Sequence, residues 1–123
     1  MQIQLDALKH NDDPFPDAGI ARVFSFASPS NRSRTGPLPH FADMIHSGFG
    51  EMLNYKDARL LPGAMRGATA LQPVEVTGRD GAVYRYVFVL TRQTEPPYNG
   101  CWMTDSVIGD PLAARASSED HSI

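Results

Sequence analysis

The 123-residue chain has a single cysteine, Cys101, and one cysteine cannot form an internal disulfide. This absence fits a reducing compartment. No apolar run approaches the roughly 20 residues that a membrane-spanning helix needs, and residues 1–6 lack the basic start and apolar stretch of a secretory signal. We therefore expect a soluble, cytoplasmic protein without a membrane partner.

The sequence also has little net charge. Eleven Lys and Arg stand against fourteen Asp and Glu, which gives a formal charge of −3 and an isoelectric point near 5.7. Such a balance provides no global attraction to nucleic acid, and the basic residues are scattered with little aromatic interleaving. We expect no nucleic-acid partner, and no residue pattern predicts a cofactor.

The period of the hydrophobic residues changes once, near the middle of the chain. Up to about residue 50 the apolar residues recur at helical spacing, and after about residue 57 they alternate. Helices followed by an antiparallel sheet predict one α+β domain over residues 1–108. The Ala-, Ser- and charge-rich residues 109–123 predict a mobile C-terminal tail.

The first half predicts three helices. The first spans about residues 1–10, and the second follows Asp17, a favourable N-cap residue. The third starts near Pro37, where a missing N–H costs nothing, and ends near Gly48. We expect residues 28–37 to form a polar loop between the second and third helices.

The second half predicts about four strands, at residues 57–61, 69–77, 82–92 and 101–108. The residues from Gly78 to Gly81 indicate a hairpin turn. Alternation along the third strand places Tyr84, Tyr86, Phe88 and Leu90 on one face. We expect three helices to pack on the concave face of this curved sheet, with its aromatic side toward them.

Three helices followed by a curved antiparallel sheet resemble the cystatin-like, or nuclear-transport-factor-two-like, cone fold. A closer resemblance is to a family of uncharacterised domains of this fold class from bacteria, cyanobacteria and plant plastids, and it covers about residues 2–108. It rests on Phe24-Ser25-Phe26-Ala27-Ser28-Pro29, Asn31-Arg32, Thr35-Gly36-Pro37, Phe41 and Met44, and then on Gly81, Tyr86, Arg92-Gln93 and Gly100-Cys101-Trp102-Met103-Thr104-Asp105.

This resemblance implies a fold but no activity. In many domains of this shape a Trp of the last strand packs inward, which implies an inward-facing Trp102, and many dimerise through the sheet, which implies a possible homodimer. The wider group holds both enzymes and non-catalytic binding modules, so the fold does not choose between them.

An aromatic set is the first candidate site. Its members are expected to line an apolar pocket inside the cone, or else to form the packed core between sheet and helices. They are Tyr55, Tyr84, Tyr86, Phe88 and Trp102.

The polar segment before the third helix is the second candidate. Free N–H groups and two guanidinium groups there suit a phosphate or carboxylate. The alternative is that the same side chains bond the loop's own backbone and cap the helix. The residues concerned are Asn31, Arg32, Arg34, Thr35 and Gly36.

Three further features suggest a chemical role, and each of them also has a purely structural interpretation. Asp105 is a candidate general base inside the cone, or it pairs with an arginine such as Arg85, or it points to solvent. Cys101 is expected to be a small buried residue, because no helix or histidine is placed to activate its thiol. The spacing of His40, Asp43 and His46 suggests a metal set, but these residues fall opposite the helix's apolar face, so we expect no metal site.

Two functions follow. The first is a non-catalytic module that binds a small apolar or amphipathic ligand, or a protein, through the sheet cavity or a sheet face. The second is a cofactor-free hydrolase or isomerase that uses Asp105 and a tyrosine inside the cone. The enzyme predicts a carboxylate in an open pocket, whereas the binding module needs only hydroxyls and apolar walls.

Overall fold

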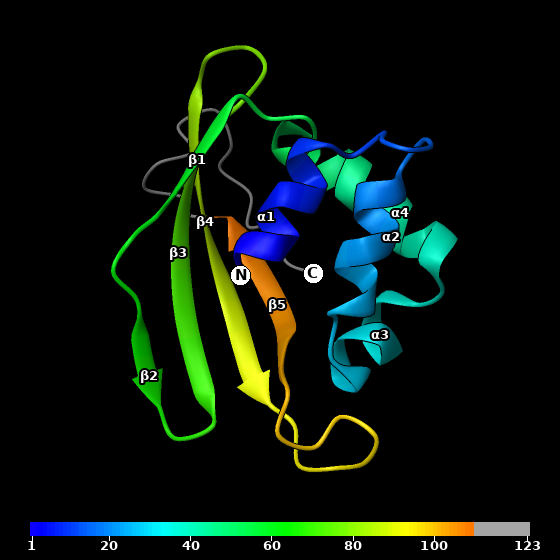
Figure 1. Ribbon diagram of the computed structural model, residues 1–123, viewed down its shortest axis with the longest axis vertical. Helices are drawn as coiled ribbons and strands as arrows, with labels where there is room; N and C mark the ends of the chain where they lie inside the picture. The colour runs from blue at the N-terminus through cyan, green and yellow to red at the C-terminus, as the bar shows by residue number, and fades with distance from the viewer. Residues whose placement is uncertain (110–123) are drawn as a thin grey trace.

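A layer of helices packs against one face of an antiparallel sheet in the computed structural model, which describes residues 1–109 (Figure 1). Four helices come first and five strands follow, so the predicted α+β class is confirmed. The expected mobile tail lies, from residue 110 onward, outside the described residues. The elements are α1 (Gln2–Lys9), α2 (Ala18–Ser25), α3 (Pro29–Thr35), α4 (Leu38–Gly48), a 3-10 turn (Gly50–Met52), β1 (Asp57–Leu60), β2 (Ala64–Arg66), β3 (Thr69–Thr77), β4 (Val83–Arg92) and β5 (Trp102–Gly109).

The sheet runs in the order β1-β3-β4-β5, and every neighbouring pair is antiparallel. Both β1 and β2 pair with β3, β1 near its C-terminal end and β2 near its N-terminal end. The predicted bounds of the long strands hold to within a residue or two, because their alternation is regular. The three-residue β2 was not predicted, since it is too short for alternation to be recognised.

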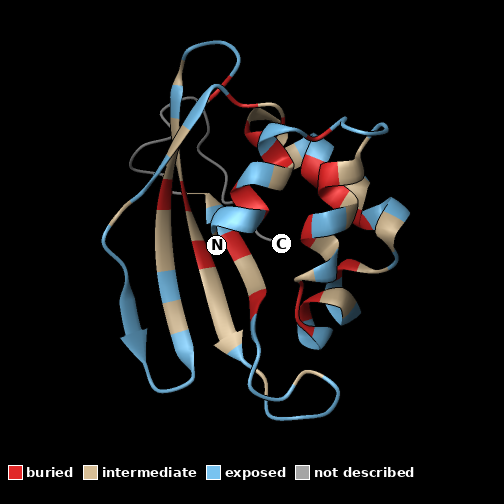
Figure 2. Cartoon of the chain, in the orientation of Figure 1, coloured by how far each residue is buried: buried red, intermediate tan, exposed pale blue. Residues whose placement is uncertain are grey.

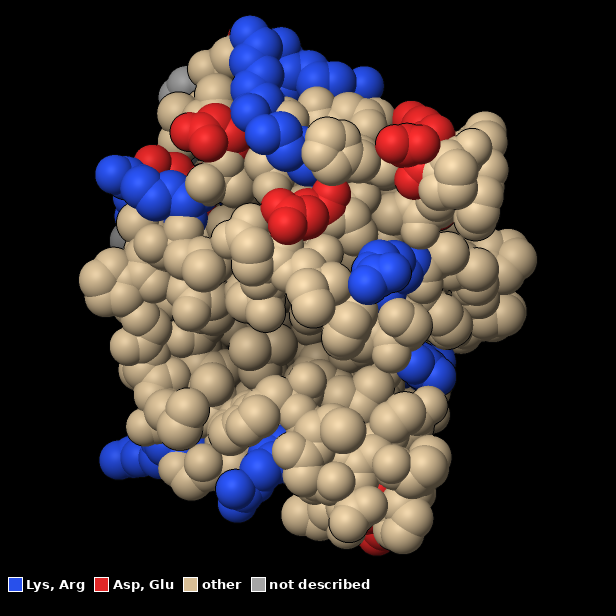
Figure 3. Space-filling model, in the orientation of Figure 1, with Lys and Arg blue, Asp and Glu red and all other residues tan. Residues whose placement is uncertain are grey.

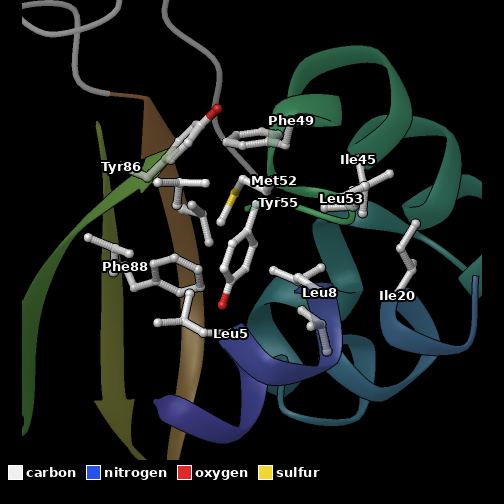
Figure 4. Close-up of a cluster of buried hydrophobic side chains, with 14 of the residues drawn as sticks. Leu5, Leu8, Ile20, Ile45, Phe49, Met52, Leu53, Tyr55, Tyr86 and Phe88 are labelled. Atoms are coloured by element: carbon white, nitrogen blue, oxygen red, sulfur yellow. The ribbon is translucent and has the colours of Figure 1, made fainter. Parts of the chain in front are cut away.

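The core lies between the helices and the sheet face that carries Tyr86 and Phe88 (Figure 4). Every second residue of β3 and β4 points at the helices, which contribute apolar stripes at helical spacing. The buried cluster comprises Leu5, Leu8, Ile20, Val23, Phe41, Ile45, Phe49, Met52, Leu53, Tyr55, Val74, Val76, Tyr86, Phe88 and Val107.

The helices cover only one end of the sheet (Figures 1 and 2). Val74 and Val76 on β3 are fully buried, whereas Ala70, on the same face, is only half-buried. On β4, Tyr86 and Phe88 are buried and Leu90 is half-buried. The end of the sheet formed by β2, the start of β3 and the end of β4 is therefore open on its helix-facing side.

The polar segment 28–37 is a helix and a turn, which corrects the expected loop. Ser28 is the N-cap of α3, its hydroxyl accepting from the Asn31 N–H at 3.1 Å, and Pro29 occupies the first turn. Gly36 ends the helix with a φ of 78°, a conformation that glycine adopts freely. This helix consists of a proline and six polar residues, so it has no apolar stripe that periodicity could reveal.

No helix within residues 1–109 is both long and apolar enough to cross a membrane.

Candidate functional site

A groove that several large apolar side chains line occupies the open end of the sheet. It has a volume of about 420 Å³, and its walls come from β2 and the residue before it, from the first half of β3, and from the facing ends of β4 and β5. The lining residues are Gly63, Ala64, Met65, Ala70, Leu71, Gln72, Leu90 and Trp102. We refer to this set as the groove.

The register of the strands places the groove on the helix-facing side. Met65 pairs with Ala70, and Ala70 pairs with Leu90, so these three side chains share one face. Leu90 lies two residues beyond Phe88 on β4, and residues two apart point to the same side. The groove is thus a continuation of the core face beyond the edge of the helices.

Large apolar side chains are left in contact with water there. Met65 is 70% exposed and Trp102 is 36% exposed. Figure 3 shows the hollow as a surface of uncharged residues, with Lys or Arg side chains along its lower border. A concave apolar surface of this kind is typical of a ligand site, because single exposed apolar residues rarely gather in a hollow.

Two small features keep the groove open and give it one polar group. A Cβ on Gly63 would come within 2.5 Å of the Leu71 carbonyl oxygen, so only glycine lets the chain approach β3 this closely. The Gln72 amide nitrogen donates to the carbonyl oxygens of Leu61 and Pro73 at 2.8 and 2.9 Å. These bonds fix the side chain and leave its amide oxygen as the acceptor for a ligand.

The five aromatic candidates are divided between the core and the groove. Tyr55, Tyr86 and Phe88 are buried in the core cluster, and Tyr84 packs against it with its hydroxyl donating to Asp80 at 2.7 Å. Trp102 alone lines the groove. Trp102 faces the expected side of the sheet but is 36% exposed and lies outside the buried core cluster.

The buried tyrosines predict an alkaline loss of stability. Burial, with smaller effects from Asp6 and Asp57, raises the pKa of Tyr55 to about 12, and burial also raises the pKa of Tyr86. The unfolded chain ionises first, near a pKa of about 10. The free energy of unfolding should therefore fall as the pH rises from about 10 to 12. Urea titrations across this range should show a shallower fall for Tyr55→Phe, and an equal fall would contradict the assignment.

The anion candidates are engaged with their own fold. Asn31 donates from its side chain to the Thr104 carbonyl oxygen at 3.1 Å, and the Thr35 hydroxyl donates to the Asn31 carbonyl oxygen at 3.0 Å. Arg32 donates to the Ser25 carbonyl oxygen and lies over the Phe24 ring, with its carbon 5.1 Å from the ring centre. Arg32 and Arg34 lie in the last turn of α3, where the negative end of the helix dipole stabilises positive charge.

Asp105 is a residue of β5, and its carboxylate contacts α3 and the N-cap residue of that helix. Its carboxylate accepts from the Ser28 hydroxyl at 3.1 Å and lies 3.8 Å from the Arg34 guanidinium, which also donates to the Asp105 carbonyl oxygen. Its side chain is one-third exposed and lines no part of the groove. Arg85, the arginine that the sequence suggested as its partner, pairs instead with Glu75 across the sheet at 3.4 Å.

The remaining candidates are also separate from the groove. Cys101 is exposed, which corrects the expectation that it is buried, because it lies in the loop before β5 and not on its inner face. His46 pairs with Asp17 at 3.0 Å, and His40 contacts the Thr35 carbonyl oxygen. Residues 1–109 contain no group of three side chains suited to a metal ion.

Sequence reasoning missed most of the groove, although one signal pointed to it. The longest strand, β4, has ten residues and extends roughly 33 Å, whereas the longest helix, α4, has eleven residues and extends roughly 17 Å. Helices of this length leave part of a long strand uncovered. The location of the open end depends on how the helices dock, which no local pattern encodes.

Comparison with known proteins supplies the family. No curated protein and no solved structure matches the chain. Residues 1–112 match the model of one family, described as a domain of unknown function. This agrees with the resemblance to a family of uncharacterised domains, while the cystatin-like relationship and the range of organisms stay predictions. Because the match spans most of its length, the chain belongs to the DUF4864 family, a domain of unknown function.

Proposed function

We propose that the protein is a non-catalytic module that binds a small apolar or amphipathic ligand in the groove. One observation carries this proposal: a hollow of about 420 Å³ on the otherwise closed face of the sheet leaves Trp102 and Met65 exposed. Small-molecule sites have volumes of about 300–1,000 Å³ and mainly apolar walls with a few polar groups. The groove matches this range in volume, and its walls combine large apolar side chains with the Gln72 amide and backbone polar groups.

The lining also suits the task chemically. An aromatic ring offers a broad rigid surface, and a methionine adapts its flexible thioether to irregular shapes. Water that leaves Trp102, Leu90 and Met65 on binding supplies the favourable free energy, in proportion to the apolar area covered. No covalent step is required of any residue in the groove.

The single tryptophan makes the proposal directly testable. Because Trp102 is the only tryptophan in the chain and lines the groove, its fluorescence reports occupancy. We expect 10-bromodecanol, whose bromine quenches indole on contact, to quench Trp102 in a saturable manner. The same ligand should raise the melting temperature, because it binds the native state.

A matched pair of variants locates the binding. Ala70→Leu places a larger side chain inside the groove and should weaken binding by about tenfold or more, a loss of roughly 1.4 kcal/mol. Ser106→Leu, a half-buried position that pairs with Val89 on the opposite face, should leave binding unchanged. Absence of saturable quenching in the parent protein, or equal binding by Ala70→Leu, would overturn the proposal.

The alternative function, a cofactor-free hydrolase or isomerase, gains no support from the position of Asp105, which binds Ser28 and Arg34 outside the groove. The expected homodimer stays a prediction. The outer sheet face exposes Val83 and Ile108, and sedimentation equilibrium would measure whether copies associate. If the fluorescence test finds no ligand, this face becomes the surface to examine for protein interaction.

A further inference from the structure

A positively charged residue lies next to one end of the groove. Arg92 is the last residue of β4, two residues after the groove residue Leu90, and it pairs in register with the groove residue Trp102. Both relations put its side chain on the helix-facing side of the sheet. Arg92 is exposed and lies next to the lining residues of the groove, at the end away from Gln72.

Arg92 is exposed and carries a charge that the described residues 1–109 do not neutralise by an ion pair. Within residues 1–109 its side chain makes no ion pair, in contrast to Arg34, Arg59 and Arg85. None of the groove residues is acidic. Glu95, in the loop after β4, is exposed and carries the one carboxylate of that loop, and it forms no pair with Arg92. A hollow lined by Trp102, Leu90 and Met65, beside a guanidinium that makes no ion pair within residues 1–109, is complementary to an amphipathic anion.

We propose that the groove binds an amphipathic monocarboxylate, with the alkyl or aromatic body over Leu90, Met65 and Trp102 and the carboxylate on Arg92. The inference rests on the proposed function, since it names the class of ligand for the same groove. From the row of Arg92 to that of Phe88 and Gln72 is four residues along β4, about 13 Å. That length accommodates a medium-length chain such as that of decanoate.

The test compares two competitors of equal chain length, decanoate and decanol, by how far each displaces 10-bromodecanol and restores the fluorescence of Trp102, below their solubility limits. We expect the carboxylate to bind about tenfold more tightly, because a hydrogen bond to a charged group is the stronger kind. Arg92→Gln should remove this preference while leaving the affinity for the alcohol unchanged. Arg92→Lys should keep part of it, because the charge remains and the planar fork is lost.

Arg66 supplies the matched control. It ends β2 at the same end of the sheet, but it pairs with Thr69, which pairs with Thr91, so strand alternation puts it on the opposite face. Arg66→Gln changes the net charge equally and should leave the carboxylate preference within about twofold of the parent. An equal effect of the two substitutions would show long-range attraction and overturn the role of Arg92.

The outcomes distinguish a failure of the ligand class from a failure of the proposed ligand-binding function. If the alcohol binds and the carboxylate binds no more tightly, the groove is a ligand site and the assignment of its ligand class is wrong. If neither compound binds the parent protein, both the ligand class and the proposed function fail. If the carboxylate binds more tightly but Ala70→Leu leaves it unaffected, the anion binds elsewhere and the inference fails alone.

Discussion

Replacing Phe88 with alanine is expected to lower the free energy of unfolding by about 3–5 kcal/mol. Phe88 is 1% exposed, in the middle of the central strand β4, and belongs to the cluster that joins the sheet to the helices (Figure 4). Its strand neighbours in register are Gln72 and Val107. Removing the ring leaves a cavity that the flanking strands cannot close, because their hydrogen bonds fix their spacing.

Urea unfolding monitored by circular dichroism measures this loss. Val83→Ala is the control, because Val83 lies on the same strand and opposite face and is 50% exposed. It should change the free energy of unfolding by less than about 1 kcal/mol. A loss below about 1 kcal/mol for Phe88→Ala would mean that Phe88 lines open space, as the pocket interpretation of the aromatic row requires.

The aromatic row was interpreted either as packed core or as pocket lining, and each interpretation applies to a different part of β4. Tyr86 and Phe88 are enclosed by helices, and Leu90, two residues further, lines the groove. The change takes place within one face of β4, so alternation alone cannot reveal it. Stability measurements report the enclosed part, and ligand binding reports the open part.

The regular parts of the fold were predictable because their signals are local. Alternation from Val83 to Arg92 and a glycine-rich turn from Gly78 to Gly81 specify a hairpin, and the structure pairs β3 with β4 across it. The apolar stripe of α2, with Ile20 and Val23 buried, follows from helical spacing in the same way.

The remaining features depend on contacts between distant segments. The helix α3 owes its place to Ser28, whose N–H donates to the Thr104 carbonyl oxygen, and to the Asn31 side chain, which bonds the same oxygen. The groove depends on where the helix layer ends. Of its lining residues the sequence indicated Trp102 alone, because a lone methionine, alanine or glutamine in a strand carries no distinguishing pattern.

The start of α2 also depends on a contact between separate segments, which a local capping pattern does not predict. Asp17 occupies the N-cap position, as predicted, but its φ of 60° is left-handed and its side chain forms no cap bond. A capping side chain needs an extended backbone to reach the second or third N–H of the helix. Asp17 instead pairs with His46, and the cap comes from Asn11, six residues earlier in the chain.

Replacing Asn11 with alanine is therefore expected to lower the free energy of unfolding by about 2 kcal/mol. Asn11 is 1% exposed, its side-chain oxygen accepts from the Ile20 N–H at 3.0 Å, and its carbonyl oxygen accepts from the Gly19 N–H at 2.9 Å. Alanine keeps the carbonyl bond and leaves the buried Ile20 N–H without a partner. Urea unfolding of both forms measures the difference.

Asp17→Ala is the matched comparison, because it removes the residue that the local pattern assigns as the cap. It deletes an exposed ion pair with His46 and a bond from the Asn11 side chain, so we expect a loss below about 1 kcal/mol. The ranking of the two variants decides which residue holds the start of α2. A larger loss for Asp17→Ala than for Asn11→Ala would show that the local cap dominates, and that the bond from Ile20 to Asn11 contributes little to folding.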